Sequence, residues 1–168
     1  MWWILPLALA AGVVALDQLS KQLVLRFLYE GEIAVIDGVL HFTYVENRGM
    51  AFGLLAEHRW VFLLFSSIGI IFLSLYLWRY ANTRLSRIGL GLVIGGGIGN
   101  MIDRLALGFV VDFIDFCAFD FWVWVFNVAD AAVCVGGAIF LLDLILEIVR
   151  VSRAGPEKGK GADDAEKS

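Results

Sequence analysis

The sequence predicts an all-α membrane protein: a four-transmembrane-helix bundle with a small β-hairpin and a short interfacial helix at one membrane face. Composition is the first reason, because 60% of the 168 residues are hydrophobic, only 18% are charged and the mean hydropathy is +0.81. Soluble domains are less apolar than this. The second reason is that four apolar segments are long enough to cross a hydrocarbon core about 30 Å thick. They are residues 2–27, 60–78, 88–107 and 124–149.

The first segment, residues 2–27, contains Asp17 and Lys21 within apolar sequence. An acid four residues before a base on a helix favours a stabilising ion pair. A cleaved signal peptide would need a basic start, and here apolar sequence resumes beyond Lys21. Ser20 and Lys21 do not resemble a nucleophile pair, because adjacent helical positions point about 100° apart. We therefore interpret this segment as a membrane span with an internal ion pair.

The connection after the first span predicts two small elements at the membrane surface. Residues 32–46 alternate loosely and are rich in β-branched and aromatic side chains, with Asp37 and Gly38 where a tight turn would fall. This pattern predicts a β-hairpin. Residues 50–58 could form a short amphipathic helix on the membrane surface.

The second segment, residues 60–78, has no ionisable side chain and a tryptophan at each end. The connection that follows, residues 79–87, contains three arginines and no acid. The positive-inside rule therefore predicts that this connection is cytoplasmic. Both termini would then be cytoplasmic, and the hairpin would face outward.

The third and fourth segments also contain charges. With the predicted orientation, five ionisable residues fall at one depth in the outer half of the membrane. They are Asp17, Lys21, Asp103, Arg104 and Asp130. A charge in hydrocarbon costs roughly 3 kcal/mol or more unless it meets a partner or water, so we expect one shared polar cavity. Asp143, about 20 Å beyond Asp130 along the helix, is instead expected to solvate the cytoplasmic end.

Two carboxylates are candidates for chemistry because no Lys or Arg lies within four residues of either. They are Asp112 and Asp130. Two carboxylates a few ångströms apart share a proton, so that one can activate water while the other polarises a carbonyl. Such a pair would hydrolyse a peptide bond without a metal. A proton-coupled transporter or channel would also use intramembrane acids, whereas a structural adaptor would have no need of them.

We expect no metal ion and no cofactor. His41 and His58 do not have the spacing of a catalytic zinc motif. Cys117 and Cys134 lie in unrelated apolar contexts, without the paired spacing of a disulfide framework or a thiolate site.

Five motifs resemble lipoprotein signal peptidase, the prokaryotic signal peptidase II, in the order and spacing of that family. They are DQLSK (17–21), NRGMAFG (47–53), GGGIGNMIDR (95–104), VVDFIDF (110–116) and FNVAD (126–130). The resemblance covers the chain up to about Arg150. It departs from the family at Met50, where a small residue is frequent, and at Ala131, where a serine is frequent, and neither position is a carboxylate.

The resemblance implies an aspartic endopeptidase that removes the signal peptide from diacylglyceryl-modified prolipoproteins by cleaving before the lipidated cysteine. It implies an active site near the outer face of the cytoplasmic (inner) membrane. Asp112 and Asp130 match the catalytic pair. The residues that match positions lining or bracing the site are Asp17, Lys21, Asn47, Gly49, Asn100, Asp103, Arg104 and Asn127. The expected partners are the lipid-modified prolipoprotein and membrane lipid, with no nucleic acid, and we expect a monomer.

Helical spacing agrees with parts of this assignment. Asn100 with Asp103, and Asn127 with Asp130, are i,i+3 pairs, so each acid has an amide on its own helix face. The glycines of residues 95–99 favour close helix packing. We expect one domain over residues 1–150 and a disordered cytoplasmic tail over residues 151–168.

Overall fold

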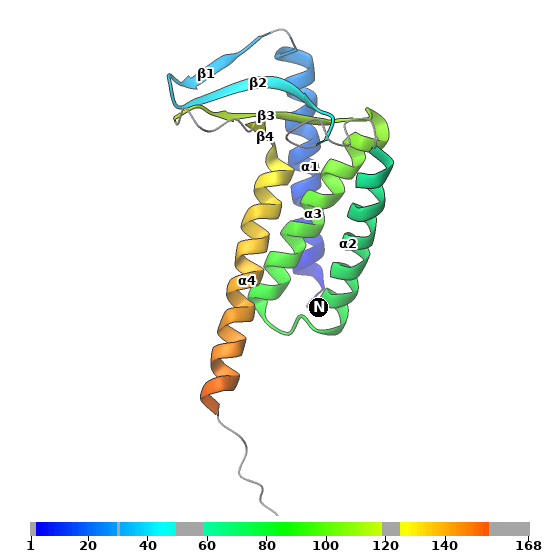
Figure 1. Cartoon of the computed structure of the whole chain (residues 1–168), viewed down its shortest axis with the longest axis vertical. Coiled ribbons are helices and arrows are strands. Elements are labelled where there is room, and N and C mark those ends of the chain that lie inside the picture. Colours follow the sequence, from blue (N-terminus) through cyan, green and yellow to red (C-terminus); the bar gives the residue numbers. More distant parts are fainter. Residues whose placement is uncertain (1–2, 30, 50–58, 119–124, 155–168) are drawn as a thin grey trace, which may run out of the picture.

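Four long helices stand side by side, and an antiparallel sheet lies across one end of them (Figure 1). The structure, a computed structural model, describes residues 3–29, 31–49, 59–118 and 125–154. The helices are α1 (Ile4–Phe27), α2 (Arg59–Arg79), α3 (Arg84–Ala106) and α4 (Val128–Ala154). Each of them is long and apolar enough to cross a membrane, which confirms the predicted four-helix bundle.

Both ends of the predicted fourth span differ from the structure. The fourth span was expected from residue 124, but α4 begins at Val128, because the residues just before it form a short strand. At its other end α4 continues to Ala154, past the predicted end of the span at residue 149. The predicted interfacial helix, residues 50–58, lies outside the described residues, as does the tail beyond Ala154.

The sheet has four strands in the order β1-β2-β3-β4. They are β1 (Ile33–Ile36), β2 (Leu40–Asn47), β3 (Val110–Phe116) and β4 (Val125–Phe126). β1 and β2 form the predicted hairpin, and Gly38 in its turn has a φ of +68°, which favours glycine. β3 was not predicted as a strand. It pairs with β2, and Val45 lies opposite Asp112.

α3 lies between the other helices and packs closely against two of them (Figure 1). A Cβ atom added at Gly95 would lie 2.8 Å from the Cα of Ala10 in α1, and one added at Gly96 would lie 2.8 Å from Cγ2 of Val133 in α4. The helix backbones could not approach this closely with larger residues. The glycine cluster therefore has the packing role expected from the sequence.

Asp143 corrects one prediction. The residue was expected to solvate the cytoplasmic end of the bundle, but its side chain is buried, with a relative exposure of 5%. Its carboxylate accepts hydrogen bonds from Thr83 Oγ1 at 2.8 Å and from Ser86 Oγ. The α2–α3 connection and the first turn of α3 supply these hydroxyls, so the acid bonds to a neighbouring helix instead of water.

Candidate active site

A buried cluster of charges connects α1 to α3. The Lys21 ammonium lies 2.8 Å from Asp17 Oδ2 and 2.8 Å from Asp103 Oδ2, and it donates to Asn100 Oδ1 at 3.0 Å. The predicted Asp17–Lys21 pair is thus confirmed, and Asp103 is a second carboxylate partner. All three charged side chains are buried, which is tolerable because each is paired.

The two carboxylates of this cluster also bond to backbone groups of neighbouring elements. Asp17 Oδ1 accepts a hydrogen bond at 2.9 Å from the amide of Ala129, in the first turn of α4. Asp103 Oδ2 accepts one at 3.1 Å from the amide of Val111, in β3. The charge cluster therefore positions the two elements that follow it in the chain, β3 and α4.

Asp112 lies on β3 and is almost fully buried, with a relative exposure of 2%. Asn47 Nδ2 donates to its Oδ2 at 2.8 Å, and Asn127 Nδ2 donates to its Oδ1 at 2.6 Å. Burial raises the pKa of the Asp112 carboxyl to about 6, and the negative charge of Asp130 adds to this rise. The two amide donors and the charge of Lys21 oppose it.

Asp130 lies in the first turn of α4, where Asn127 is the residue before the helix. The Asn127 Oδ1 atom accepts from the Asp130 amide at 2.9 Å, and Asp130 Oδ2 accepts from the Asn127 amide at 3.3 Å. This reciprocal arrangement is a capping box. Asn100 Nδ2 donates to the other carboxylate oxygen, Asp130 Oδ1, at 2.8 Å.

The two candidate catalytic carboxylates therefore share one asparagine, Asn127. Asn127 bonds to both Asp112 and Asp130, and its Nδ2 also lies 3.2 Å from Asn100 Oδ1. Because Lys21 and Asn127 both donate to Asn100 Oδ1, the Asn100 Nδ2 group faces Asp130. The sequence placed Asn100 beside Asp103, but the hydrogen bond from its amide goes to Asp130 on another helix.

The remaining candidates lie beside the same region. Gly49 has a φ of +112° and donates its amide to Asn47 Oδ1 at 3.1 Å, which orients the Asn47 side chain. A Cβ atom at Gly49 would lie 2.7 Å from the Phe62 ring, so a larger residue does not fit there. The Arg104 guanidinium lies 5.3 Å from the centre of the same ring and donates to Asn100 O at 3.3 Å.

Arg104 brings a positive charge to the site. Its guanidinium interacts electrostatically with Asp130, Asp112 and Asp103. A cation near two carboxylates favours at least one of them being ionised. All ten residues that the sequence singled out are thus found in one connected region.

Sequence reasoning missed two residues of this region. Gln18 Nε2 donates to Asp103 Oδ1 at 2.8 Å and to Gly99 O at 3.2 Å, which joins α1 to α3. A polar residue beside Asp17 within an apolar span was a signal that could have identified it. Phe62 contacts Arg104 but looks like any other apolar residue of its span, so the sequence carries no signal for it.

The chemistry of the region is that of paired carboxylates. Across the described residues, no group of three or more His, Cys, Asp or Glu side chains is arranged to bind a metal ion. Two acids that bond to the same asparagine, one of them with a pKa raised to about 6, can divide the roles of general base and general acid.

Comparisons with known proteins identify the family of the chain. A family model described as Signal peptidase (SPase) II matches residues 9–146. The lipoprotein signal peptidase of Clostridioides difficile (strain 630) is 45% identical over 146 residues, which cover 84% of this chain and 94% of the relative. The lipoprotein signal peptidase of Syntrophomonas wolfei is 42% identical over 142 residues, 84% of this chain and 93% of the relative.

Solved structures give the same fold. One bacterial membrane enzyme, determined by the in meso method at 2.3 Å resolution, has a TM-score of 0.77 and 27% identity, covering 92% of this chain and 93% of that one. Another, at 1.9 Å resolution, has a TM-score of 0.77 and 29% identity, covering 83% and 91%. The family match spans most of the sequence and includes both candidate carboxylates. The chain therefore belongs to the signal peptidase II family and is an aspartic endopeptidase.

Proposed function

We propose that this enzyme removes the signal peptide from diacylglyceryl-modified prolipoproteins, cleaving before the lipidated cysteine with Asp112 and Asp130 as a catalytic dyad. Relatives that are 42% and 45% identical are lipoprotein signal peptidases, which supports prolipoproteins as the substrate class. The observation that carries the dyad is the sharing of Asn127 by the two carboxylates.

In the proposed mechanism the ionised member of the dyad takes a proton from water, and the resulting nucleophile attacks the scissile carbonyl. The neutral member donates its proton to the developing oxyanion, which stabilises the tetrahedral intermediate. Collapse of that intermediate breaks the C–N bond: the carboxyl that took a proton from water gives it to the leaving amine, and the other carboxylate takes back the proton that it had given to the oxygen. Asn47, Asn100 and Asn127 hold the carboxylates in place through their amide donors.

An apolar groove along the same stretch of α3 as Asn100 and Arg104 supports a lipid-modified substrate. It has a volume of about 350 Å³ and lies between α2 and α3. Its lining residues are Ser67, Ile70, Ile71, Ile98, Met101, Ile102 and Leu105. Met101 and Leu105 each directly follow a residue of the polar site, Asn100 and Arg104. We propose that an acyl chain of the substrate lies in this groove while the peptide reaches the carboxylates.

The proposed orientation puts the sheet and the dyad at the outer face of the cytoplasmic (inner) membrane, with both termini in the cytoplasm. The sheet and the dyad lie at one end of the bundle, and the arginine-rich α2–α3 connection lies at the other (Figure 1). The positive-inside rule supports the cytoplasm for the latter end. A single chain supplies every residue of the proposed site, which supports a monomeric enzyme.

A proton-coupled transporter would need a polar path through the membrane. Between the dyad and Asp143, α3 and α4 pack backbone to backbone: a Cβ at Gly89 would lie 2.9 Å from the Phe140 amide nitrogen, and one at Gly136 would lie 2.7 Å from Leu92 Cβ. Such close contact leaves little room for a path at this helix interface. The peptidase is therefore the better explanation of the acids.

The test is cleavage of a purified diacylglyceryl-modified prolipoprotein by the full chain in detergent, with EDTA present. Asp112→Asn and Asp130→Asn should each lower kcat by roughly 10²-fold or more, because an amide cannot act as a base. Asp115→Asn is the matched control, since Asp115 lies on the same strand but bonds to no dyad residue in the described structure. Retained cleavage in either dyad variant contradicts the assignment.

A further inference from the structure

Three polar side chains at the end of β2 form a hydrogen-bond network beside the proposed active site. Tyr44 Oη donates to Glu46 Oε1 at 3.1 Å. Arg48 donates to Glu46 Oε2 from Nε at 3.1 Å and from Nη2 at 2.6 Å. Both carboxylate oxygens of Glu46 therefore accept hydrogen bonds. These three residues are called the Glu46 network below.

The two outer members of the Glu46 network rest on one apolar cluster. Tyr44 packs against this cluster, and the Arg48 guanidinium lies 5.5 Å from the centre of the Phe109 ring, which also packs against it. A guanidinium over an aromatic face is attracted by the charge distribution of the ring. The buried members of the cluster are Val24, Leu28, Val111 and Phe113. The network is thus anchored at both ends.

The protonation states of the Glu46 network are fixed over the pH range in which Asp112 titrates. Hydrogen bonds from Arg48 and Tyr44 hold the pKa of Glu46 below its usual value. Burial and the hydrogen bond to Glu46 raise the pKa of Tyr44 to about 12. Near pH 6, Glu46 is therefore an ionised acceptor and Tyr44 a neutral donor.

The Glu46 network lies on the opposite side of the chain from the Asn47 side chain. Side chains alternate along a strand, so Tyr44, Glu46 and Arg48 share one face. Asn47 points to the other face, where its Nδ2 donates to Asp112 at 2.8 Å. Asn47 is also the last residue of β2. The contact between Glu46 and Arg48 joins the residues directly before and after it.

The same contact determines where the other hydrogen bond of Asn47 forms. The Gly49 amide donates to Asn47 Oδ1 at 3.1 Å, and Arg48 is the residue directly before Gly49. A shift of Arg48 would move this donor. Because Oδ1 and Nδ2 belong to one planar amide group, the Nδ2 atom that faces Asp112 would turn with it.

We propose that Tyr44, Glu46 and Arg48 are positioning residues for the cleavage reaction, which hold the chain after β2 so that the Asn47 amide donates to Asp112. The proposal rests on the proposed function, since the position of Asn47 matters to cleavage only if Asp112 belongs to the dyad. The Glu46 network acts through Asn47 and contributes no group to the reaction itself.

The experiment is the pH profile of kcat/KM for the full chain in detergent, comparing the wild type with Glu46→Gln and Arg48→Met. The Asn47 hydrogen bond lowers the pKa of Asp112, so a misplaced amide should raise it. Both variants should move the limb near pH 6 to higher pH by roughly half a unit, about a threefold change in the protonation equilibrium.

The sign of the shift distinguishes positioning from a direct effect of charge. Removing the negative charge of Glu46 would by itself favour the ionised form of Asp112 and move the limb to lower pH. An upward shift in Glu46→Gln therefore requires a change in the Asn47 hydrogen bond. Combined with Asn47→Ala, Glu46→Gln should cause no further shift, because the group that it positions is already absent.

Two variants of ion pairs complete the comparison. Glu32→Gln is the matched control, since Glu32 pairs with His41 at the opposite end of β2, and it should leave the limb unchanged. Arg48→Lys keeps a cation beside Glu46 and should shift the limb less than Arg48→Met does.

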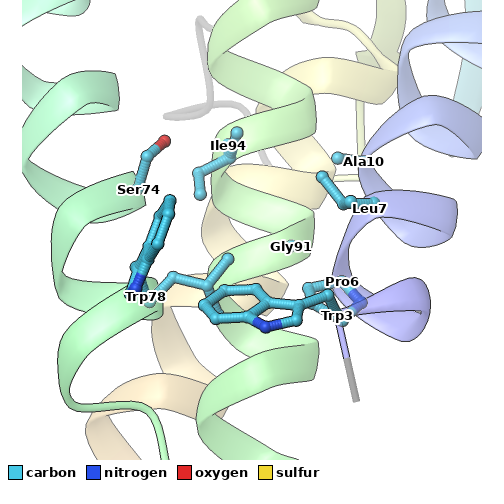
Figure 2. Close-up of a pocket in the computed structure, with 9 residues that line it drawn as sticks. Trp3, Pro6, Leu7, Ala10, Ser74, Trp78, Gly91 and Ile94 are labelled. Atoms are coloured by element: carbon cyan, nitrogen blue, oxygen red, sulfur yellow. The ribbon is translucent and has the colours of Figure 1, made fainter. Parts of the chain in front are cut away.

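Leu77→Ala separates positioning from stability. Leu77 is buried and lines an apolar cavity of about 420 Å³ between α1, α2 and α3, at the end of the bundle opposite the sheet (Figure 2). Enlarging this cavity should lower Tm and leave the limb in place. Glu46→Gln should do the reverse, because an ion pair whose Arg48 side chain is 64% exposed contributes little to stability.

Infrared titration reads the pKa of Asp112 without substrate, from the carboxyl band that Asp112→Asn removes. If the wild type does not cleave the prolipoprotein, the proposed function fails, and this band still tests the positioning. No shift or a downward shift in Glu46→Gln overturns the proposal. A higher KM in Arg48→Met with an unchanged profile in Glu46→Gln also overturns it, because Arg48 would then bind the substrate.

Discussion

The Asn47 amide stabilises the ionised form of Asp112 through a 2.8 Å hydrogen bond. Burial raises the pKa of Asp112 to about 6, and this donor limits the rise. Removing the donor in Asn47→Ala should therefore raise the pKa further. We expect the limb of the kcat/KM profile that titrates near pH 6 to move to higher pH by about one unit, since one unit corresponds to about 1.4 kcal/mol.

The direction of that limb distinguishes the two roles. If activity rises with pH through the limb, the ionised dyad member is the base, and if activity falls, the protonated member is required. Asn82→Ala is the control, because Asn82 is exposed in the α2–α3 connection, far from the dyad. An unshifted limb in Asn47→Ala would show that this hydrogen bond does not control the titration.

Lys21 bonds to two buried carboxylates, so its removal leaves both unpaired. Lys21→Met should lower the free energy of unfolding by about 3–5 kcal/mol. The double variant Lys21→Met/Asp103→Asn should lose less than the sum of the two single variants, because one unpaired charge is removed with its partner. Denaturant unfolding of all four proteins in one detergent measures this coupling, and strictly additive losses would contradict it.

At the scale of single residues, the sequence predicted which residues lie close together but not which atoms form the hydrogen bonds. The motifs and the common depth of the charges predicted the composition of the site. Helical spacing suggested that the Asn100 side chain lies beside Asp103, whereas its amide donates a hydrogen bond to Asp130. Spacing within one helix predicts which residues lie on the same face. It does not predict contacts between helices, because these depend on how the helices pack. For the same reason Asp143 was wrongly expected in solvent.

Among the elements, α3 and α4 meet at Gly96, where a methyl group would press on Ala129 and Val133. Gly96→Ala should force α4 outward, with a loss of about 1–3 kcal/mol in the free energy of unfolding. Because Asp130 follows Ala129, kcat should also fall, by a factor on the order of 10². Thermal unfolding and the cleavage assay measure the two effects.

Gly69→Ala in α2 is the matched control, since an added Cβ there has no neighbour within 4 Å. Its stability and activity should equal those of the wild type. If Gly96→Ala behaves in the same way, close packing of α3 on α4 does not position the dyad.

The helices could be predicted from apolar length alone, but β3 could not. Its pairing partner β2 is distant in sequence, and no strand was predicted for residues 110–116. A strand that gains its hydrogen bonds from a distant segment has little local signal. The hairpin of β1 and β2 was predictable because its turn residues lie between its strands.

At the scale of the whole molecule, buried polar groups occur at both ends of the bundle. Ser86 donates to Asp143 at the end opposite the dyad. Ser86→Ala removes one of the two hydroxyl donors and should lower the free energy of unfolding by about 1–3 kcal/mol. The pH profile of cleavage should not change, because the dyad keeps all its donors.

Ser152→Ala, at an exposed position near the end of α4, is the control for this substitution and should leave both measurements unchanged. Thermal unfolding measures the stability, and kcat/KM measures the pH profile of cleavage. The assay range is about pH 4.5 to 8.5, which includes the Asp112 pKa of about 6. Equal stability of the two variants would show that the Ser86 hydroxyl contributes little.

The two proposed catalytic carboxylates come from β3 and from the first turn of α4, and Asn127 both caps that helix and bonds to Asp112. During biosynthesis, a chain with only its first three helices in the bilayer already contains Asp112 but neither Asp130 nor the cap. The proposed dyad therefore predicts that hydrolysis waits until the last helix has inserted and docked. On the proposed dyad, we therefore expect the newly made enzyme to stay inactive until its own membrane assembly is complete.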